Sequence, residues 1–493
     1  MKKILLFSLL VLFSCNLKNN NLPNVIVILV DDLGYADLGF TGSNEISTPN
    51  IDGLAENGVI FTDGYVSYAV CSPSRAGLIT GRYQDTFGYG LNALYTPKDP
   101  NMGLPLSEFT IADLFKTKNY KTLAVGKWHL GAHESLRPLN RGFDEFFGFL
   151  TGGHQYFPEQ WNLADETEVK CNFCAYRTKL LRNEERIDEN EYLTDALSRE
   201  TVSFIDKSSK SPFFIYLAYN APHGPLQATE KYLKRFPNIK DKRRKTYAAM
   251  VSSIDDGVGQ IVAILKKHEI YDNTIIYFLS DNGGASSNAS NNAPLKSHKG
   301  TLYEGGIRIP FVMQWPNEIK SGTIFKKPII SLDIFATSKA IINPDLKLKN
   351  EIHGQNLLPY IKGNDGGYPH EYLYWRNNGH QPYIENGVRA RYITHAVRSK
   401  NYKMFIRRGD SMLFDLSSDI GEKNNIIEKN RPLFNELVKK SVEWNKTLMD
   451  PIFLGLRDDE LYNKLNPDRY LSLIHISEPT RPRLISYAVF CLK

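Results

Sequence analysis

The 493-residue sequence predicts an α/β protein with a large, mixed but mostly parallel sheet sandwiched by helices, and a smaller C-terminal α+β domain built on an antiparallel sheet. Three observations lead to this prediction. Unbroken apolar, β-branched runs recur along the chain, as in strands buried on both faces of a parallel sheet. Segments with apolar residues at helical spacing lie between these runs. Shorter β-like runs and one more helical pattern follow towards the C-terminus.

Four apolar runs predict the central strands of the large sheet: residues 25–30, 121–125, 213–219 and 274–279. Each run leads into residues of the metal-binding or acid–base type. Because open α/β sheets bind ligands at the carboxyl ends of their strands, we expect the four junctions to converge on one crevice. Helical crossovers are expected at residues 49–57, 110–118, 192–207 and 245–268. The stretch 141–149 is expected to be an aromatic loop that packs rather than binds.

A stretch rich in Asn, Gly, Pro and Lys near 345–370 marks the predicted domain boundary. We assign the larger domain to residues 23–350, the smaller domain to 351–455 and a C-terminal segment to 456–470. The smaller domain should hold strands near 372–375, 392–397, 403–406 and 412–416, and a helix over 432–448.

The first residues predict export. Two lysines precede a short apolar run, which indicates a signal peptide over residues 1–15 rather than a membrane-spanning helix. The run that ends at Cys15 resembles a bacterial lipobox, and Cys15 would then carry a lipid anchor. Phe13 is not the small residue usual there, so plain signal cleavage is the alternative. Residues 16–22 resemble a polar tether. The expected location is therefore the bacterial periplasm or cell surface, with the membrane as a partner through Cys15.

Residues 471–493 resemble the translation of a sequencing-library adapter, so they are excluded from the fold prediction, and the natural C-terminus would then be lost. An unusual β-rich tail is the alternative. The signal peptide and this tail each carry a net charge of +2, so the formal charge of +6 falls to +2 without them. That balance implies no basic face for nucleic acid.

Three cysteines remain between the two ends: Cys71, Cys171 and Cys174. The last two form a single C-x-x-C in a polar segment, and no further pair of zinc ligands lies at suitable spacing. In an exported chain, a local disulfide that pins a loop is the better interpretation.

The segment 71–82 places a thiol at the mouth of a predicted helix. Ser72 is expected to cap the first turn, with Pro73 at the first helical position and Gly81 as the C-terminal stop. Free N–H groups and the partial positive charge of a helix N-terminus lower a thiol pKa and attract anions. Arg75, one turn on, adds a planar donor fork suited to a tetrahedral oxyanion. A buried cysteine beside an ordinary helix start is the alternative.

This segment also resembles the signature of the formylglycine-dependent (type I) sulfatases of the alkaline phosphatase superfamily, C-x-P-S-R-x-x-x-[LI]-T-G-[RK]. It matches at every fixed position, and the resemblance extends over about residues 24–425. It implies an alkaline-phosphatase-like fold. It also implies that a formylglycine-generating enzyme oxidises Cys71 to an aldehyde, 3-oxoalanine, which makes Cys71 the precursor of the nucleophile.

Two pairs of oxygen ligands follow predicted strands: Asp31, Asp32, Asp281 and Asn282. Such a set suits a hard cation, Ca²⁺ or Mg²⁺, and argues against zinc. The resemblance places all four in a metal site and points to one Ca²⁺ ion.

Lys127 and His129 lie two residues apart in an extended segment and should therefore face the same way. The resemblance implies that Lys127 and Lys299 bind the sulfate oxygens together with Arg75. It further implies that His129 supports the aldehyde hydrate and that His223 contacts sulfate near the leaving oxygen.

The function that this resemblance implies is hydrolysis of sulfate esters, with release of inorganic sulfate from a sulfated polysaccharide or oligosaccharide. Four residues in polar or aromatic loops are expected to contact the sugar: His154, Trp375, Arg376 and His380. One alternative is a phosphomonoester or phosphonate-ester hydrolase of the same superfamily, because phosphate and sulfate are both tetrahedral anions. Another is a non-catalytic lipoprotein that binds sulfated glycan, if Cys71 is never oxidised.

Overall fold

The computed structural model describes residues 22–164, 168–378, 382–385, 388–391, 393–407, 409–455, 458–465 and 467. The expected signal peptide, the anchor at Cys15, residues 16–21 of the tether, the tail 471–493 and His380 lie outside the described residues.

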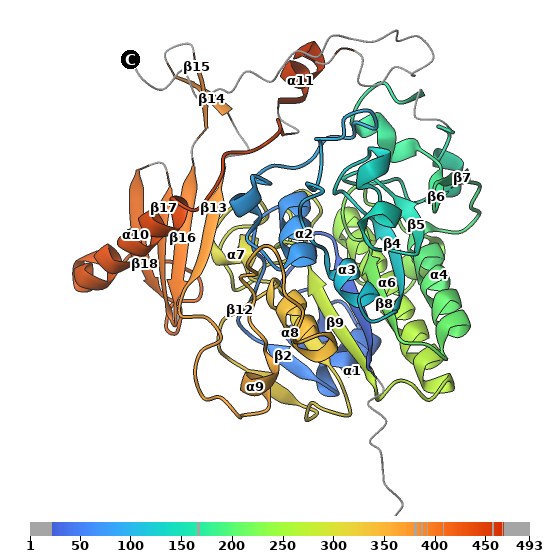
Figure 1. The fold of residues 1–493 in the computed structure, drawn as a ribbon, viewed down its shortest axis with the longest axis horizontal. Coiled ribbons are helices and arrows are strands. Elements are labelled where there is room, and N and C mark those ends of the chain that lie inside the picture. The colour runs from blue at the N-terminus through green and yellow to red at the C-terminus, as the bar shows by residue number, and fades with distance from the viewer. Residues whose placement is uncertain are drawn as a thin grey trace, which may run out of the picture.

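A ten-stranded mixed sheet forms the centre of the molecule, in the order β11-β2-β10-β9-β1-β8-β4-β5-β6-β7 (Figure 1). Its middle is parallel: β1 pairs with β8 and β9, and β4 pairs with β8 and β5. β10 runs antiparallel to β9 and β2, and β6 runs antiparallel to β5 and β7. The strands are β1 (Asn24–Val30), β2 (Val59–Phe61), β4 (Lys121–Lys127), β5 (Glu145–Phe149), β6 (Leu180–Arg182), β7 (Glu185–Ile187), β8 (Phe213–Ala218), β9 (Thr274–Ser280), β10 (Phe311–Gln314) and β11 (Thr323–Phe325). The mixed, mostly parallel sheet of the predicted fold is confirmed.

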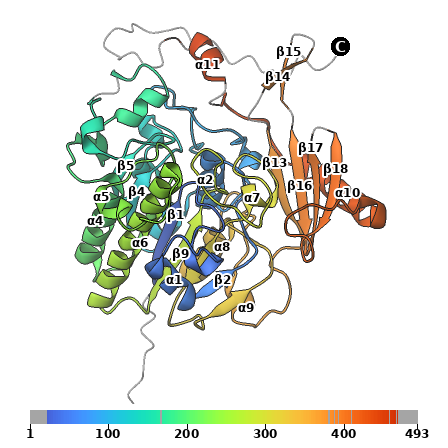
Figure 2. The same cartoon turned by 180° about the vertical axis from the view of Figure 1, so that it is seen from behind.

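Alternate residues of β1 enter two separate hydrophobic cores, because successive side chains of a strand point to opposite faces. Val25, Val27 and Leu29 pack on one face, and Ile26, Ile28 and Val30 pack on the other. The first face is covered by α2 (Cys71–Thr80), α3 (Ile111–Lys116) and α8 (Asp333–Ile342); the second is covered by α1 (Pro49–Glu56), α4 (Leu193–Ser208) and α6 (Lys242–Lys267) (Figure 2). Within the described residues, α6 alone is long and apolar enough to cross a membrane, and it is mostly buried in the second core.

The expected aromatic loop at 141–149 is wrong in its second half, because β5 is a strand of the sheet. It pairs in parallel with β4, and Phe146, Phe147 and Phe149 are buried. The pairing depends on Gly148, which lies opposite Gly126. A Cβ atom at Gly148 would lie only 2.1 Å from the Gly126 carbonyl oxygen. This close backbone approach is what a sequence pattern of aromatic residues does not reveal.

A second, four-stranded antiparallel sheet lies beside the first, in the order β13-β16-β17-β18, with α10 packed against β16 and β17 (Figure 1). Its elements are β13 (Leu373–Asn377), β16 (Thr394–Ser399), β17 (Tyr402–Arg407), β18 (Asp410–Asp415) and α10 (Arg431–Asn445). The predicted α+β organisation is confirmed here. The boundary at residue 350 stays a prediction.

Smaller elements are β3 (Gly64–Tyr65), β12 (Ile329–Ile330), β14 (Pro382–Glu385), β15 (Val388–Arg391), α5 (Glu230–Leu233), α7 (Glu304–Ile307), α9 (Leu358–Ile361) and α11 (Asp459–Leu465).

A buried ionic cluster joins the two sheets. Lys403 of β17 donates to Glu304 of α7 and to Glu422, both at 2.9 Å, and all three side chains are fully buried. Arg398 of β16 pairs with Asp63 at 2.6 Å. The smaller domain is therefore tied to the larger one through fully or mostly buried charges.

Candidate active site

α2 begins at Cys71, and all ten of its residues are buried. The expected cap at Ser72 is wrong: Val70 precedes the helix in an extended conformation, and Ser72 is already its second residue. The Ser72 hydroxyl instead donates to the His129 carbonyl oxygen at 2.7 Å, which ties the helix start to the segment after β4. The expected stop at Gly81 is confirmed by its left-handed conformation, with φ of 67°.

The Cys71 thiol is only 2% exposed and lies 2.9 Å from the Lys299 ammonium. Burial raises the pKa of Cys71 to about 12, and the nearby Lys127 and Lys299 only partly offset this effect. The thiol is therefore protonated at neutral pH. This contradicts the activated thiol that a helix N-terminus alone would predict, because desolvation outweighs the helix charge.

The four expected metal ligands meet at the carboxyl ends of two paired strands. Asp31 and Asp32 follow β1, and Asp281 and Asn282 follow β9. Carboxylate oxygens of the three aspartates and the Cys71 sulfur lie within 4.8 Å of one another. The Asn282 side-chain oxygen is buried and has no hydrogen-bond partner among the described residues. An orphaned amide oxygen beside three carboxylates fits a hard cation.

Each carboxylate in this cluster has its own cation. Lys127 Nζ lies 2.5 Å from Asp31, and Lys299 Nζ lies 2.6 Å from Asp32. Burial would raise the pKa of Asp32, but Lys299 and His223 more than offset burial and lower it to about 2. Burial and then Asp31 raise the pKa of Asp281 to about 6.

Arg75 is the third cation, and its position differs from the expectation. Its Nε and Nη2 donate to Asp281 Oδ2 at 2.9 and 2.7 Å, and its Nη1 donates to the Lys127 carbonyl at 3.0 Å. The side chain is completely buried. Arg75 therefore orients a metal ligand in this structure and does not present its donor fork to an incoming oxyanion.

Three histidines line the same cavity: His129, His223 and His298. His129 has a φ of 55°, and its buried Nδ1 has no partner among the described residues. Burial, together with Lys127 and Arg75, keeps the pKa of His129 well below its usual value. His223 Nδ1 bonds the Gly224 carbonyl at 2.7 Å, and its Nε2 is 3.8 Å from Asp32. Burial is also the main reason why the pKa of His223 falls to about 3.

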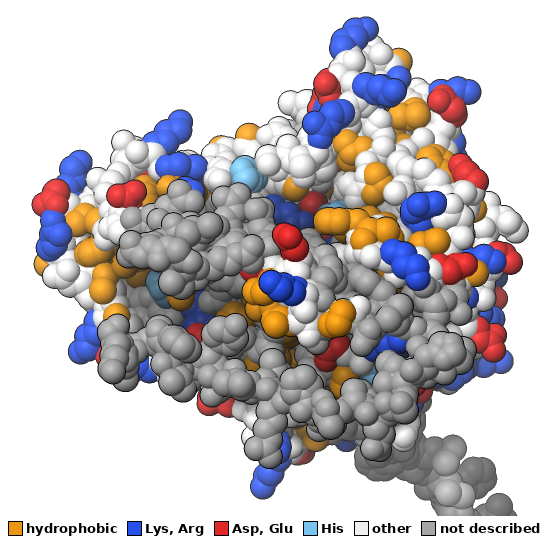
Figure 3. Space-filling model, turned by 90° about the horizontal axis from the view of Figure 1, so that it is seen from above, with side chains coloured by type: hydrophobic (Ala, Val, Ile, Leu, Met, Phe, Trp, Pro, Cys, Tyr) orange, Lys and Arg blue, Asp and Glu red, His pale blue; other side chains and the backbone are white. Residues whose placement is uncertain are grey.

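The cavity has a volume of about 400 Å³, with Cys71, His129, His223 and Lys299 among its lining residues. Histidine, basic and acidic side chains are visible near the middle of the face seen in Figure 3. Sequence reasoning missed most of the other lining residues, among them Asn92, Asn172, Phe173, Tyr176, Ser286, Ser287 and Asp458.

Three expected sugar contacts are wrong, because the side chains are packed away from the cavity. His154 is fully buried, and its two ring nitrogens lie 2.9 Å from the carbonyls of Gln155 and Thr178. Trp375 is also fully buried and donates to the Val66 carbonyl at 2.7 Å. Arg376 pairs with the buried Asp85 at 3.0 Å. The fourth, His380, lies outside the described residues.

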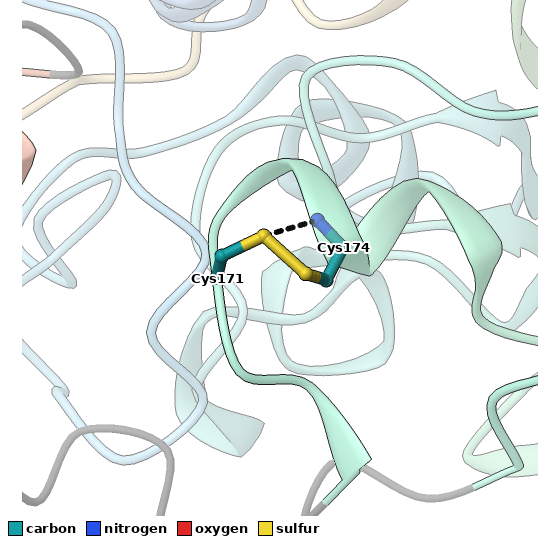
Figure 4. Close-up of a disulfide and its surroundings, with 2 residues drawn as sticks. All are labelled: Cys171 and Cys174. Carbon is teal, nitrogen blue, oxygen red and sulfur yellow. Dashed lines mark hydrogen bonds between the residues drawn. A yellow bond between two sulfur atoms is a disulfide. The ribbon is translucent and has the colours of Figure 1, made fainter.

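The expected disulfide between Cys171 and Cys174 is confirmed, and the Cys174 N–H donates to the Cys171 sulfur at 3.0 Å (Figure 4). The short loop that it closes carries two of the missed lining residues, Asn172 and Phe173. In the sequence, the C-x-x-C motif was therefore the only signal for the loop that forms this part of the cavity wall.

Comparison with known proteins agrees with this geometry. The family model described as Sulfatase matches residues 23–341, more than half of the chain. The chain belongs to the sulfatase family. The model described as N-sulphoglucosamine sulphohydrolase, C-terminal, matches residues 297–447 of this sulfatase. The protein is thus a sulfuric ester hydrolase of the alkaline phosphatase superfamily.

Relatives of this sulfatase include N-acetylgalactosamine-6-sulfatase of Mus musculus, which is 35% identical over 376 residues that cover 72% of this chain and 69% of the relative. The uncharacterized sulfatase YdeN of Escherichia coli (strain K12) is 32% identical over 407 residues, which cover 72% of this chain and 68% of YdeN. Among solved structures, Ps i-CgsB in complex with k-i-k-neocarrahexaose superposes with a TM-score of 0.82 at 40% identity, covering 91% of this chain and 98% of that one.

Proposed function

We propose that this sulfatase releases inorganic sulfate from a sulfated polysaccharide or oligosaccharide, with a formylglycine formed from Cys71 and one Ca²⁺ ion. The observation that carries the proposal is the position of Cys71 on a 400 Å³ cavity, within 4.8 Å of three carboxylates that are each paired with a cation. Formylglycine would supply a hydroxyl nucleophile in its hydrated form, and Ca²⁺ would supply positive charge to a sulfate oxygen.

Asp31, Asp32, Asp281 and Asn282 would hold the Ca²⁺ ion, since carboxylate oxygens of the three aspartates lie within 4.8 Å of one another and the buried Asn282 side-chain oxygen has no hydrogen-bond partner among the described residues. Arg75 would fix the orientation of Asp281 through two hydrogen bonds.

The two lysines would bind the sulfate group. Both Nζ atoms lie at the metal cluster, and Lys299 also reaches the Cys71 sulfur. Positive charge at these positions stabilises the negative charge on the oxygens of the transferring group.

His223 would protonate the departing sugar oxygen. Its Nδ1 lies on a backbone carbonyl, so Nε2 is the nitrogen that faces the cluster. A bound sulfate ester brings negative charge next to the imidazole and raises its pKa from the low value that burial and Lys299 impose. His129, neutral and with an unpartnered Nδ1, would accept a hydrogen bond from the nucleophilic hydroxyl.

Carbohydrate substrates are supported by the relatives. One relative is named N-acetylgalactosamine-6-sulfatase, and a solved structure of Ps i-CgsB is a complex with k-i-k-neocarrahexaose. The cavity also has the size of a small-molecule binding site.

The maturation and location belong to the same proposal. A formylglycine-generating enzyme would oxidise Cys71, and the chain would be exported to the periplasm or cell surface and held there by a lipid on Cys15. The Cys171–Cys174 disulfide supports an oxidising location.

Sulfate release from defined sulfated saccharides, measured with protein co-expressed with the maturation enzyme, tests the proposal. Cys71→Ala should lose all turnover and keep the wild-type melting temperature. Mass spectrometry of the Cys71 peptide should show conversion to the aldehyde. Faster release of phosphate than of sulfate from matched esters, or turnover by Cys71→Ala, would refute the proposal.

A further inference from the structure

One exposed aromatic side chain on the cavity wall has no role in the chemistry described above. Nine large hydrophobic side chains are clearly exposed in the described part of the chain, and of these only Phe173 lines the cavity that holds Cys71. Its side chain is 59% exposed. Single exposed hydrophobic side chains are common on protein surfaces, so what distinguishes Phe173 is its place on the wall of the cavity that holds Cys71.

The backbone around Phe173 is fixed on both sides. The Cys171–Cys174 disulfide closes the turn that carries it, and Asn172 Oδ1 accepts a hydrogen bond from the Tyr95 N–H at 2.8 Å. After the turn, Ala175 is fully buried in the first core. The loop therefore holds Phe173 in place without covering it.

Tyr176 connects this loop to the floor of the site. It lines the same cavity and packs edge to face against Phe173, with ring centroids 5.6 Å apart. Tyr176 also lies close to Gly153, where an added Cβ would approach the tyrosine ring to 2.7 Å. Tyr176 is partly buried and Phe173 is exposed, so the two rings form one apolar wall that rises from the floor to the rim.

We propose that this wall is a carbohydrate subsite, in which Phe173 stacks on the sugar ring next to the sulfated one. The inference rests on the proposed function and names a substrate class for it: sulfated oligosaccharides with at least one ring beyond the sulfated residue. Sugar rings present an apolar face of C–H groups, and an aromatic ring held rigidly in advance binds such a face at little entropic cost. The disulfide fixes the subsite in place.

The test compares long and short ligands. Binding is measured by calorimetry to a Cys71→Ala protein, in which no turnover occurs, with hexasaccharides of carrageenan, chondroitin sulfate and fucoidan and with the matching sulfated monosaccharides. Phe173→Ala in that background should weaken the tightest hexasaccharide by about tenfold and the monosaccharide by less than about twofold, in keeping with the value of one aromatic contact. Phe173→Tyr should restore the wild-type ratio.

Leu106→Ala is the matched control, because Leu106 is as exposed as Phe173, at 62%, and does not line the cavity. It should change neither affinity. A Cys171→Ser/Cys174→Ser protein should lose hexasaccharide affinity in the same direction as Phe173→Ala.

Equal loss for long and short ligands would show that the loop only supports the fold, and it would overturn the subsite. An unchanged ratio in Phe173→Ala, or no binding of any hexasaccharide, would overturn it as well. Because these measurements need no catalysis, the two proposals can fail separately: a selective loss of hexasaccharide affinity in Phe173→Ala, together with no sulfate release by the matured protein that retains Cys71, would refute the proposed chemistry and leave the subsite standing.

Discussion

Replacing Lys403 by methionine tests the ionic connection between the two domains. Lys403 is fully buried and is the ammonium shared by Glu304 and Glu422, each at 2.9 Å. Lys403 and then Arg308 oppose the burial that would raise the pKa of Glu304, and they lower it to about 2. Methionine keeps the length of the side chain and removes its charge. Two buried carboxylates would then face each other without the cation between them.

The expected loss can be worked from those contacts. Two charge-assisted hydrogen bonds are worth about 1.5–3 kcal/mol each. Glu304 retains Arg308 and Tyr65 as partners, and Glu422 can take up a proton, so the loss should fall near the lower end of that sum. We expect Lys403→Met to reduce the free energy of unfolding by about 3–5 kcal/mol, as for other buried pairs that lose one partner.

Urea unfolding followed by fluorescence at pH 7.5 measures this loss. Lys429→Met is the control, since Lys429 is exposed, and it should stay within about 0.5 kcal/mol of the wild type. Adding Glu422→Gln to Lys403→Met should recover at least about 1 kcal/mol, because it replaces the carboxyl group that the first substitution leaves without a cation. A loss below about 1 kcal/mol in Lys403→Met, or no recovery in the double variant, would refute the reasoning.

Three further predictions concern the site and its surroundings. Arg75→Lys should lower kcat by about 100-fold, because a lysine cannot replace both the Asp281 fork and the contact with the Lys127 carbonyl; wild-type kcat would contradict this. Removal of metal by a chelator should abolish sulfate release, and added Ca²⁺ should restore it. The Asn282→Ala protein should need a higher Ca²⁺ concentration for half-maximal recovery, because it lacks one ligand oxygen. An unchanged Ca²⁺ requirement would argue against Asn282 as a ligand. Burial lowers the pKa of His154, His353 and His395 to about 4 in each case. These histidines take up protons more readily in the unfolded chain than in the folded one. Their contribution to the free energy of unfolding is therefore fully present above about pH 6.5 and is lost as the pH falls towards 4. The loss is at most about 1.4 kcal/mol per histidine and pH unit. Urea midpoints between pH 7.5 and 5 should fall, and less steeply in His353→Gln; a flat profile would show that the histidines are not kept neutral.

Much of the fold was predictable because its central strands are local, continuous patterns. β1, β4, β8 and β9 begin and end close to the predicted residues, since each is an unbroken apolar run. β5 was missed because its place in the sheet depends on the approach of Gly148 to Gly126, a contact between segments that the sequence does not show to be neighbours.

The candidate active site, like the fold, could be predicted only in part. The metal ligands follow β1 and β9, so the pairing of these two strands brings them together as the junction pattern predicts. Lys127 ends β4, whereas Lys299 lies in a loop well after β9 and follows no strand. Trp375 was misplaced because residue chemistry alone does not tell which face of a strand points to the core, and on β13 that face is the buried one. Phe173 is a single aromatic residue in a loop, and only the folded chain places it on the cavity.

The order of strands in the central sheet also governs when Cys71 is closed off. β1 begins at residue 24, early in the chain, whereas its neighbour β9 begins only at residue 274. The two strands are joined by contacts between residues 250 apart in the sequence, such as the one from Asn24 to Thr274. Pairing between strands so far apart in the sequence is slow to form, because the long intervening chain must first be closed into a loop. During synthesis, β9 can pair fully with β1 only after residue 280 has emerged, although residues 71–82 are available long before. The topology thus provides an interval in which a side chain that ends 2% exposed would still be open to the maturation enzyme that the proposed function requires.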